Sequence, residues 1–248
     1  MNIAVCVSHV PDTTTKIRIA ADKQNIEQQG VSYILNPYDE FAIEEALKLK
    51  EKNGGEVVVI SAGGETSKET IRKALAMGAD RGVLLKTNGF VDSISLAKAL
   101  AEEIKSNGSE IVLMGKQSID YDNSITAQAA AEILGYGCVT VCVDLKIDGT
   151  KVIAEREIEG GREVVETSLP VVISAQKGLN NPRYPAIKGI MEAKRKPIAE
   201  KDAALGKVHT VLSELKLPSA KNPGRIIGTD SSAVPELVRL LREEAKVI

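Results

Sequence analysis

Residues 56–86, EVVVISAGGETSKETIRKALAMGADRGVLLK, decide the fold class of this chain. The stretch begins with an apolar run, passes two glycines, continues with apolar residues spaced three and four apart, and ends in another apolar run. A short apolar run is typical of a strand buried on both faces, and a helical spacing of apolar residues is typical of an amphipathic helix. Strand, helix and strand in this order predict a βαβ unit whose two strands run parallel.

The same alternation continues on both sides of this unit. Further strands are predicted at 2–10 and 109–115, and further helices at 36–55, 92–108 and 122–135. After Gly137, Asp-Gly and Gly-Gly turns separate extended runs, which predicts antiparallel strands added to the sheet. We therefore expect an α/β fold with a mostly parallel, twisted, Rossmann-like sheet that is covered by helices on both faces.

The C-terminal part of the chain has a different pattern. From about residue 186 the periodicity weakens, although short helices are predicted near 190–196 and 231–247. The stretch between them carries too little apolar periodicity for a core of its own. We therefore predict an α/β domain over residues 1–185, and an arm with a terminal helix over residues 186–248 that lies on another protein surface.

Composition excludes several classes of protein. Hydrophobic residues make up 43% and charged residues 27%, as in ordinary globular proteins, while aromatic residues are only 3%. The sequence holds no apolar stretch of about 18 residues and no basic-then-apolar leader, so we expect a soluble cytoplasmic protein without membrane insertion. The scarcity of aromatic side chains for base stacking argues against a nucleic-acid partner.

Charge is distributed unevenly along the chain. Residues 177–207 hold eight basic and three acidic side chains, a net +5, whereas residues 1–176 hold 18 basic and 26 acidic ones, a net −8. Such asymmetry is able to steer an acidic partner toward the basic stretch. An ordinary solvated, lysine-rich segment gives the same pattern, and the sequence leaves both interpretations open.

Cysteine and histidine form no recognisable catalytic or metal site in the sequence. Cys138 and Cys142 are four residues apart in a predicted strand, so we expect both thiols to face the same side and to be buried. His9 follows a strand, where it either touches a ligand or is a hydrogen-bonded loop residue. Because no nucleophile–base pair, P-loop or G-x-G-x-x-G motif is present, the sequence favours a binding protein over a hydrolase or a transferase.

Ligands of open parallel sheets bind at the carboxyl ends of the strands. The richest such segment is GKQSIDYDNSIT, residues 115–126. Gly115 lets the backbone approach a ligand, and Lys116 and Gln117 supply hydrogen-bond donors. A helix that starts here directs free N–H groups toward a phosphate. The alternative is an ordinary loop whose polar residues cap the following helix.

Several longer stretches, in the same order along the chain, resemble the beta subunits of electron transfer flavoproteins. GLNNPRYPAIKGIMEAKRK (178–196) is similar to the signature region of that family, and ILNPYDEFAIEEALKLKE (34–51) to its Asn-Pro-x-x-Glu-x-Ala-x-Glu-Glu-Ala stretch. ETIRKALAMGADRG (69–82) and GKQSIDYDNSITAQ (115–128) resemble its nucleotide-binding half, and EREIEGG (155–161) resembles a segment that follows it. The resemblance covers nearly the whole chain.

This resemblance implies a non-catalytic, electron-carrying subunit of a heterodimeric flavoprotein. In that family the alpha subunit holds most of a redox-active FAD at the interface. The complex takes electrons from flavin dehydrogenases, such as acyl-CoA dehydrogenases, and passes them to a quinone oxidoreductase. The C-terminal arm and helix of this chain, residues 186–248, would then pack on the alpha subunit, and Arg156 and Glu157 would lie near the FAD.

The beta subunits of the family also hold a structural AMP. Carried over to this chain, the AMP site includes Cys6 and Ala62, which would act through backbone groups. The other residues that the resemblance assigns to it are Asn36, Gly115, Lys116, Gln117, Ser118, Ile119, Asp120, Tyr121, Asp122, Asn123, Ser124, Ile125 and Thr126.

Electron-bifurcating members of the family hold a second FAD in place of AMP and oxidise NADH there. They carry Asp-Gly-Asp-Thr followed by a Val-Gly-Pro-like turn, whereas this chain has Tyr121 in place of the small glycine and Ala127-Gln128 beyond it. The bulkier side chain leaves less room, so AMP is favoured and the bifurcating alternative stays open.

The signature loop of the family docks flavin dehydrogenases through an inserted apolar side chain. The resemblance gives this role to a recognition loop at about 177–188, and we predict that Leu179 is the inserted side chain. The neighbours predicted to complete the docking site are Asn180, Pro182, Arg183 and Tyr184. Proline fixes the φ angle and so lowers the entropy lost on docking. Alternatively, Leu179 is a core residue and the prolines simply end a strand.

Two classes of protein with a similar sheet remain as alternatives. An adenylating enzyme would carry Ser-Gly-Gly-x-Asp-Ser after its first strand, whereas SAGGET (61–66) follows the second predicted strand and lacks the Asp-Ser end. A nucleotide-binding stress protein would be a homodimer without FAD, and neither the signature loop nor the C-terminal arm favours it.

Overall fold

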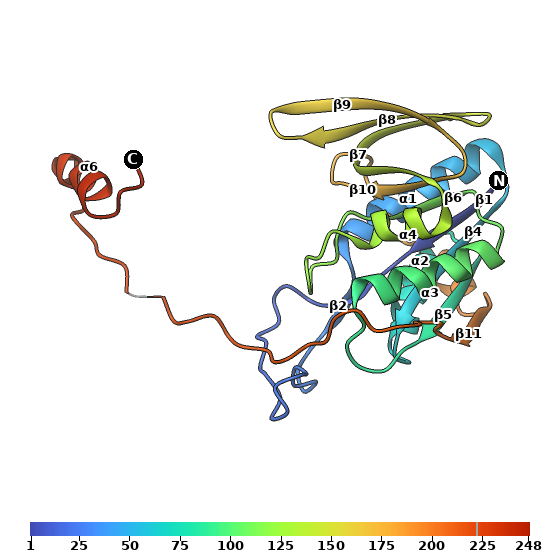
Figure 1. The fold of residues 1–248 in the computed structure, drawn as a ribbon, viewed down its shortest axis with the longest axis horizontal. Coiled ribbons are helices and arrows are strands. Elements are labelled where there is room, and N and C mark those ends of the chain that lie inside the picture. Colours follow the sequence, from blue (N-terminus) through green and yellow to red (C-terminus); the bar gives the residue numbers. More distant parts are fainter. Residues whose placement is uncertain (222) are drawn as a thin grey trace. The chain divides into compact units, whose positions relative to one another are not determined.

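A computed structural model describes residues 1–221 and 223–248 of the chain. The chain divides into two compact units, Met1–Leu215 and Lys216–Ile248. The larger unit carries the sheet and the candidate site, and the smaller unit carries the last helix (Figure 1).

Within the described residues, nine strands form the main sheet in the order β11-β5-β4-β1-β6-β10-β7-β8-β9. Their bounds are β1 (Asn2–Cys6), β4 (Glu56–Gly63), β5 (Arg81–Lys86), β6 (Ile111–Gly115), β7 (Gly137–Asp148), β8 (Lys151–Ile158), β9 (Gly161–Ser168), β10 (Val171–Ala175) and β11 (Ile198–Asp202). Neighbours from β11 to β7 pair in parallel, and β7-β8-β9 pair antiparallel. The predicted parallel sheet with antiparallel additions is therefore confirmed.

Helices cover both faces of this sheet. Their bounds are α1 (Pro37–Asn53), α2 (Ser67–Met77), α3 (Ser93–Ser106), α4 (Thr126–Leu134) and α5 (Ile187–Ala193). Buried residues of α1 and α2 share one apolar cluster, and those of α3 and α4 share a second. A small antiparallel sheet, β2 (His9–Pro11) with β3 (Tyr33–Leu35), lies between β1 and α1 in the chain.

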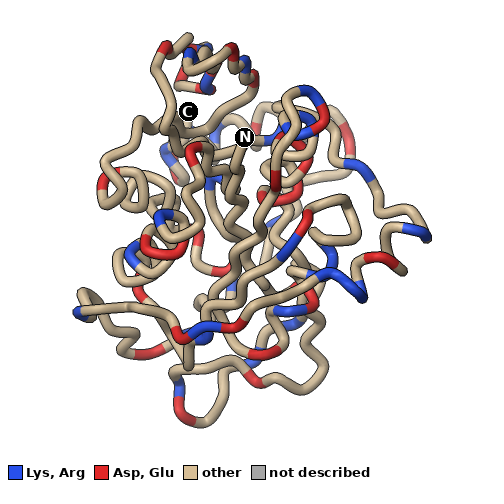
Figure 2. The backbone as a smooth tube through the Cα atoms, turned by 90° about the vertical axis from the view of Figure 1, so that its right-hand side faces the viewer, with Lys and Arg blue, Asp and Glu red and all other residues tan. Residues whose placement is uncertain are grey.

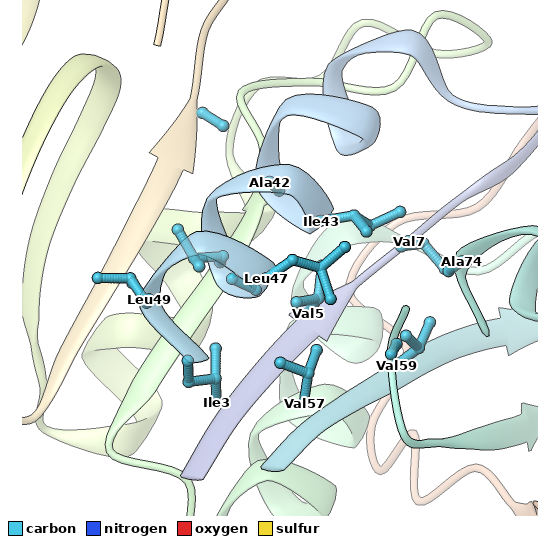
Figure 3. Packing of buried hydrophobic residues seen from close by; sticks show 14 of the residues in the cluster. Ile3, Val5, Val7, Ala42, Ile43, Leu47, Leu49, Val57, Val59 and Ala74 are labelled. Carbon is cyan, nitrogen blue, oxygen red and sulfur yellow. The ribbon is translucent and has the colours of Figure 1, made fainter. Parts of the chain in front are cut away.

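Strand β1 shows why the fold follows from the sequence pattern. Side chains alternate between the faces of a strand, so Ile3 and Val5 enter the cluster under α1 while Ala4 and Cys6 enter the cluster under α3 and α4. Both faces are covered, which explains the uninterrupted apolar run. Figure 3 shows the buried side chains of α1 above those of β1 and β4.

The stretch after residue 186 is more closely tied to the sheet than its sequence indicates. Strand β11 pairs in parallel with β5 and forms an edge of the main sheet. Just before it, the ammonium group of Lys196 donates to the carbonyl oxygens of Leu75 (3.0 Å) and Ala79 (2.6 Å) at the end of α2. A cation at this end of a helix is favourable because the last carbonyls carry partial negative charge. Residues 187–202, part of the predicted arm, thus belong to the larger unit.

The prediction that Cys138 and Cys142 face the same side is wrong. Cys142 is buried, whereas Cys138 is exposed. Between them Val141 has a φ of +57°, and the pairing of β7 with β10 shifts register there. One extra residue in a strand turns the following side chains to the other face.

The smaller unit contains a short 3₁₀ turn, η1 (Ser231–Ala233), and helix α6 (Val234–Glu243). One face of α6 is charged, with Arg239 donating to Glu236 and Glu243. The other face is apolar and remains exposed, as Leu237 and Val238 show. Such an unpartnered amphipathic helix is typical of a segment that packs on another chain.

Charged residues of both signs are interspersed along the backbone (Figure 2). Among the described helices, none is long and apolar enough to cross a lipid bilayer.

Candidate functional site

The carboxyl ends of β1, β4 and β6 lie side by side at the point where the chain stops adding strands on one side of β1 and starts adding them on the other. From β1 the chain moves outward to β4 and β5, then returns to β6 on the other side of β1. In the sheet register, Cys6 of β1 lies opposite Ile60 of β4 and Met114 of β6. Cys6, Ala62 and Gly115 therefore lie at one edge of three adjacent strands. This switch point is where open α/β sheets bind their ligands.

The first turn of α1 ties this edge together. Asn36, which is fully buried, donates from Nδ2 to the carbonyl oxygen of Gln117 at 2.9 Å. Asp39, also buried, accepts hydrogen bonds from the backbone N–H of Ser8 (2.7 Å) and of Gly115 (2.9 Å). One carboxylate thus joins the end of β1 to the end of β6.

Burial raises the pKa of the Asp39 carboxyl group from 3.8 to about 7. Hydrogen bonds from Ser8 N–H, the Asn36 side chain and Gly115 N–H act in the opposite direction, and the negative charge of Asp120 adds a small upward shift. Burial is the dominant cause because removing a carboxylate from water penalises its charged form.

Gly115 is required by this close packing. A Cβ atom at this position would lie 2.7 Å from Cβ of Tyr38 and 2.9 Å from the Tyr38 backbone carbonyl carbon. Both distances are shorter than van der Waals contact allows. Glycine therefore lets β6 end directly against the first turn of α1.

The segment after Gly115 is held by its own polar side chains. Gln117 donates from Nε2 to Asp122 at 2.6 Å, and the Ser124 hydroxyl group donates to Gln117 Oε1 at 3.1 Å. Asp122 and Ser124 both have a φ of +52°, a left-handed conformation that non-glycine residues seldom adopt. The loop is therefore bent back toward its own start.

Two further contacts fix the far side of this loop. Asn123 donates from Nδ2 to the Ser93 hydroxyl group at 2.9 Å. The Tyr121 ring packs edge-on against Phe90, with 5.5 Å between the ring centroids. The loop thus lies against the start of α3, while Tyr121 stays about half exposed.

Two buried polar atoms near this edge are left without a partner by the surrounding side chains. Asn36 Oδ1 and His9 Nε2 are buried and have no hydrogen-bond partner among the described residues, so each is free for a ligand or water. The His9 ring stacks on Tyr33 and its Nδ1 lies 2.8 Å from the Thr70 hydroxyl group. Unpaired buried polar atoms are rare in proteins and mark sites that another molecule completes.

A phosphate group would find positive charge at the same edge. Lys116 lies at the end of β6 with its ammonium nitrogen 5.1 Å from the centroid of the Tyr38 ring. Helix α4 begins at Thr126, and its first N–H groups carry partial positive charge. The Lys116 side chain precedes the 117–125 loop and the first turn of α4 follows it. Both carry positive charge that would attract an anion.

The sequence-predicted site residues fall into two groups in the structure. Cys6, Asn36, Ala62 and Gly115 come together at the switch point, together with Lys116 and Gln117. The remaining predicted residues form the loop beyond them and are mostly exposed: Ser118, Ile119, Asp120, Tyr121, Asp122, Asn123, Ser124, Ile125 and Thr126. Asp39 was missed, and its only sequence signal is a charged residue beside the helix start at Asn36-Pro37.

The residues predicted for partner docking mostly point inward. Leu179 is half-buried and packs against the core cluster under α1, and Asn180 is buried. Arg183 pairs with Glu44 of α1, while Tyr184 is 96% exposed. The exposed apolar side chains that follow Tyr184 within the next seven residues of the chain are Ile187, Ile190 and Met191.

Strand β8 carries Arg156 and Glu157, the two charged residues expected near the FAD. Glu157 accepts a hydrogen bond from Gln176 Nε2 at 3.0 Å. Arg156 pairs with Glu163 at 3.4 Å through Nη1, and its Nε is buried without a partner among the described residues. Both residues lie on the antiparallel extension of the sheet.

The chain is similar in sequence to known proteins over most of its length. Residues 24–205 match the family model described as electron transfer flavoprotein domain. The chain is 40% identical to the electron transfer flavoprotein subunit beta of Bacillus subtilis, an alignment that covers 100% of both chains. It is 43% identical to the subunit of the same name from Syntrophomonas wolfei, over 90% of this chain and 88% of the other. It is 38% identical to the pig subunit of the same name, over 98% of this chain and 97% of the other.

Proposed function

The chain belongs to the family of electron transfer flavoprotein beta subunits, and from that membership we propose that it pairs with an alpha subunit to form an electron-carrying heterodimer. Its role is in electron transfer. The complex would accept electrons from flavin dehydrogenases, such as acyl-CoA dehydrogenases, and deliver them to a quinone oxidoreductase. This chain would act as a carrier subunit rather than as an enzyme.

The nucleotide of this subunit would be AMP, bound at the switch point. The observation that carries this proposal is the buried pair Asn36 and Asp39, which ties β1 to β6 and leaves Asn36 Oδ1 free. Asn36 Oδ1 would accept a hydrogen bond from the adenosine part. Lys116 and the start of α4 would hold the phosphate. The nucleotide would be structural, since it fills a site between strand ends.

AMP is favoured over a second FAD by the way the 117–125 loop is closed. Gln117, Asp122 and Ser124 hydrogen-bond to one another, and Tyr121 packs on Phe90. A larger dinucleotide would need space that these contacts occupy. A bifurcating subunit with NADH oxidation is the alternative, and it requires this loop to open.

The redox-active FAD would be shared with the alpha subunit, and it would supply the electron-carrying group. On this chain the unpaired Arg156 Nε and the Glu157 carboxylate would line the shared site. Helix α6, whose apolar face is exposed, would pack on the alpha subunit. These two features belong to different units of the chain, so each supports the heterodimer separately.

Dehydrogenase docking would use the exposed apolar side chains that follow the signature loop. We define the docking face as Tyr184, Ile187 and Met191, which are 96%, 81% and 64% exposed. Exposed basic side chains lie close to it in the chain, namely Lys188, which pairs with Glu192 at 3.7 Å, Lys194 and Arg195. An apolar centre with a basic rim fits a partner that presents an apolar pocket rimmed by acidic groups. Leu179, Asn180 and Arg183 would support this face from beneath.

Quantifying bound nucleotides tests the proposal. The chain is co-expressed with its alpha subunit, the purified complex is unfolded, and the released nucleotides are separated and measured. One FAD and one AMP per heterodimer are expected. Two FAD without AMP would indicate a bifurcating subunit. ATP without flavin, from a chain that forms homodimers, would indicate an adenylating or stress-type protein and would contradict the proposal.

A further inference from the structure

The segment that leads into the docking face is fastened to α1 by several hydrogen bonds. Arg183 donates to Glu44 from Nε at 2.8 Å and from Nη2 at 2.9 Å, and its backbone N–H donates to the same carboxylate at 3.1 Å. Three residues earlier, Asn180 donates from Nδ2 to the Phe41 carbonyl oxygen and to Glu45, both at 2.9 Å. These contacts join parts of the chain about 140 residues apart.

Glu44 makes this attachment specific for arginine. Its side chain is only 5% exposed, and a buried carboxylate is tolerated only when it is paired and hydrogen-bonded. The guanidinium fork reaches both carboxylate oxygens at once and still has donors for Glu51, two turns further along α1. A lysine ammonium group is a point charge and cannot reproduce this two-carboxylate geometry.

The attachment lies directly before the exposed side chains. Tyr184 follows Arg183 in the chain, and Pro182 and Pro185 restrict the backbone on either side. The far end of the same stretch is fixed to α2, because Arg72 donates from Nη1 to the Lys196 carbonyl oxygen at 2.6 Å while the Lys196 side chain reaches back to α2. The docking face is thus held at both ends on two helices of the core.

We propose that Arg183 is a positioning residue for electron transfer: through Glu44 it holds Tyr184, Ile187 and Met191 in place before a dehydrogenase arrives. This inference rests on the proposed function. Fixing the face in advance lowers the conformational entropy lost on docking, so the partner binds more tightly without any direct contact to Arg183. Removing the attachment weakens docking and leaves the flavin chemistry unchanged.

The test uses the heterodimer carrying Arg183→Gln, with Lys73→Gln as the matched control. Lys73 of α2 pairs at 2.6 Å with Glu40 of α1, so the control also removes one cation that pairs with a glutamate of α1. Electron uptake from an acyl-CoA dehydrogenase is measured at varied flavoprotein concentration. Hydrogen exchange is followed for peptides that cover residues 178–193.

For Arg183→Gln we expect a KM for the flavoprotein raised about tenfold, a kcat within twofold of wild type, and unchanged FAD and AMP content. Exchange of the 178–193 peptides should be faster by a similar factor. In Arg183→Lys, both the KM and the exchange rate of these peptides should lie between those of Arg183→Gln and wild type. Lys73→Gln should behave as wild type.

Because Arg183→Gln leaves the buried Glu44 carboxylate without a cation, and only the backbone N–H of residue 183 still donates to it, the double variant Glu44→Gln/Arg183→Gln is measured in parallel. It removes both charges and should retain the fold, while the ion pair that fastens Arg183 to α1 is still lost, so its KM should also rise. An unchanged KM and unchanged exchange in the double variant would overturn the inference. A parallel loss of kcat and nucleotide content would also overturn it, since Arg183 would then support the fold. If wild type takes no electrons from any flavin dehydrogenase, the proposed function itself fails, and the positioning role fails with it.

Discussion

The Asp39 carboxylate accepts a hydrogen bond from the backbone N–H of Gly115, 2.9 Å away, although 76 residues separate them in the chain. The same carboxylate holds the N–H of Ser8 at 2.7 Å. The first turn of α1 therefore closes the gap between β1 and β6 at the edge where the nucleotide is proposed to bind.

Asp39 should make stability depend on pH. Its pKa is about 7 in the folded chain against 3.8 as the ordinary value, so the folded state binds the proton more tightly. As the pH rises from about 4 to about 7, the contribution of Asp39 to the free energy of unfolding therefore falls, by up to about 4 kcal/mol. Asn at this position does not titrate, and its Nδ2 cannot accept the second hydrogen bond.

The Tm of Asp39→Asn should therefore be lower than that of wild type at about pH 5. At about pH 8 the difference between the two Tm values should be smaller. Thermal denaturation of both proteins at the two pH values measures this. A Tm difference that is the same at both pH values would show that Asp39 does not titrate in this range.

Gly115→Ala should disturb the fold and weaken nucleotide binding at the proposed site. The added Cβ would lie within 3 Å of two Tyr38 atoms, and such overpacking costs about 1–3 kcal/mol, or a Tm lower by roughly 3–10 °C. AMP content of the purified complex should fall with it. Gly161→Ala is the control, because its Cβ would meet nothing within 4 Å among the described residues. A complex of Gly115→Ala with full AMP content would contradict the proposed site.

Ile187→Ala and Leu179→Ala should have different effects. Ile187 is 81% exposed on the docking face, so its loss should leave Tm unchanged and raise the KM for the flavoprotein about ten- to a hundredfold, as expected for one apolar side chain leaving a pocket. Leu179 packs partly against the core, and its truncation should cost about 1–2 kcal/mol of stability.

Steady-state kinetics with a flavin dehydrogenase, combined with thermal denaturation, separate these two outcomes. If Leu179→Ala raised KM strongly at unchanged Tm, while Ile187→Ala had no effect, Leu179 would be the docking residue after all.

Cys138 should be the cysteine that reacts with iodoacetamide in the folded chain. It is exposed, whereas Cys6 and Cys142 are buried, and burial raises the pKa of the Cys142 thiol to about 12. Partial desolvation by neighbouring groups also raises the pKa of the Cys138 thiol, although this residue is exposed, so its labelling rate should increase as pH rises above 8. Intact mass should show one adduct, which Cys138→Ser abolishes. Labelling of Cys142 at the same rate would contradict the register shift at Val141.

Removal of residues 216–248 should prevent assembly but not folding of the larger unit. The two units are separately compact, and none of the side chains described in α6 is buried. The truncated chain should keep its Tm and fail to co-purify with the alpha subunit or retain FAD. Leu237→Asp should have the same effect, because it places a charge on the apolar face, and Arg242→Gln serves as its control. Normal co-purification of Leu237→Asp would contradict the assembly role of α6.

The sequence alone predicted most of the strands and helices in their order, the parallel sheet with its antiparallel extension, and the family. Each of these depends on local periodicity or on contiguous motifs such as GLNNPRYPAIKGIMEAKRK. The region of the candidate site was also predictable, because the carboxyl ends of parallel strands always lie at one edge.

Which side chains meet at this edge, and which hold the segment before the docking face, follows from tertiary contacts alone. The contacts of Asp39 with Gly115 and of Arg183 with Glu44 join positions 76 and 139 residues apart, and no local pattern encodes such pairings. The bulge at Val141 puts Cys138 and Cys142 on opposite sides of the strand, because one extra residue shifts the alternation of side chains by one position. Likewise β11 is a strand because β5 offers it an edge to pair with, not because its own residues favour one.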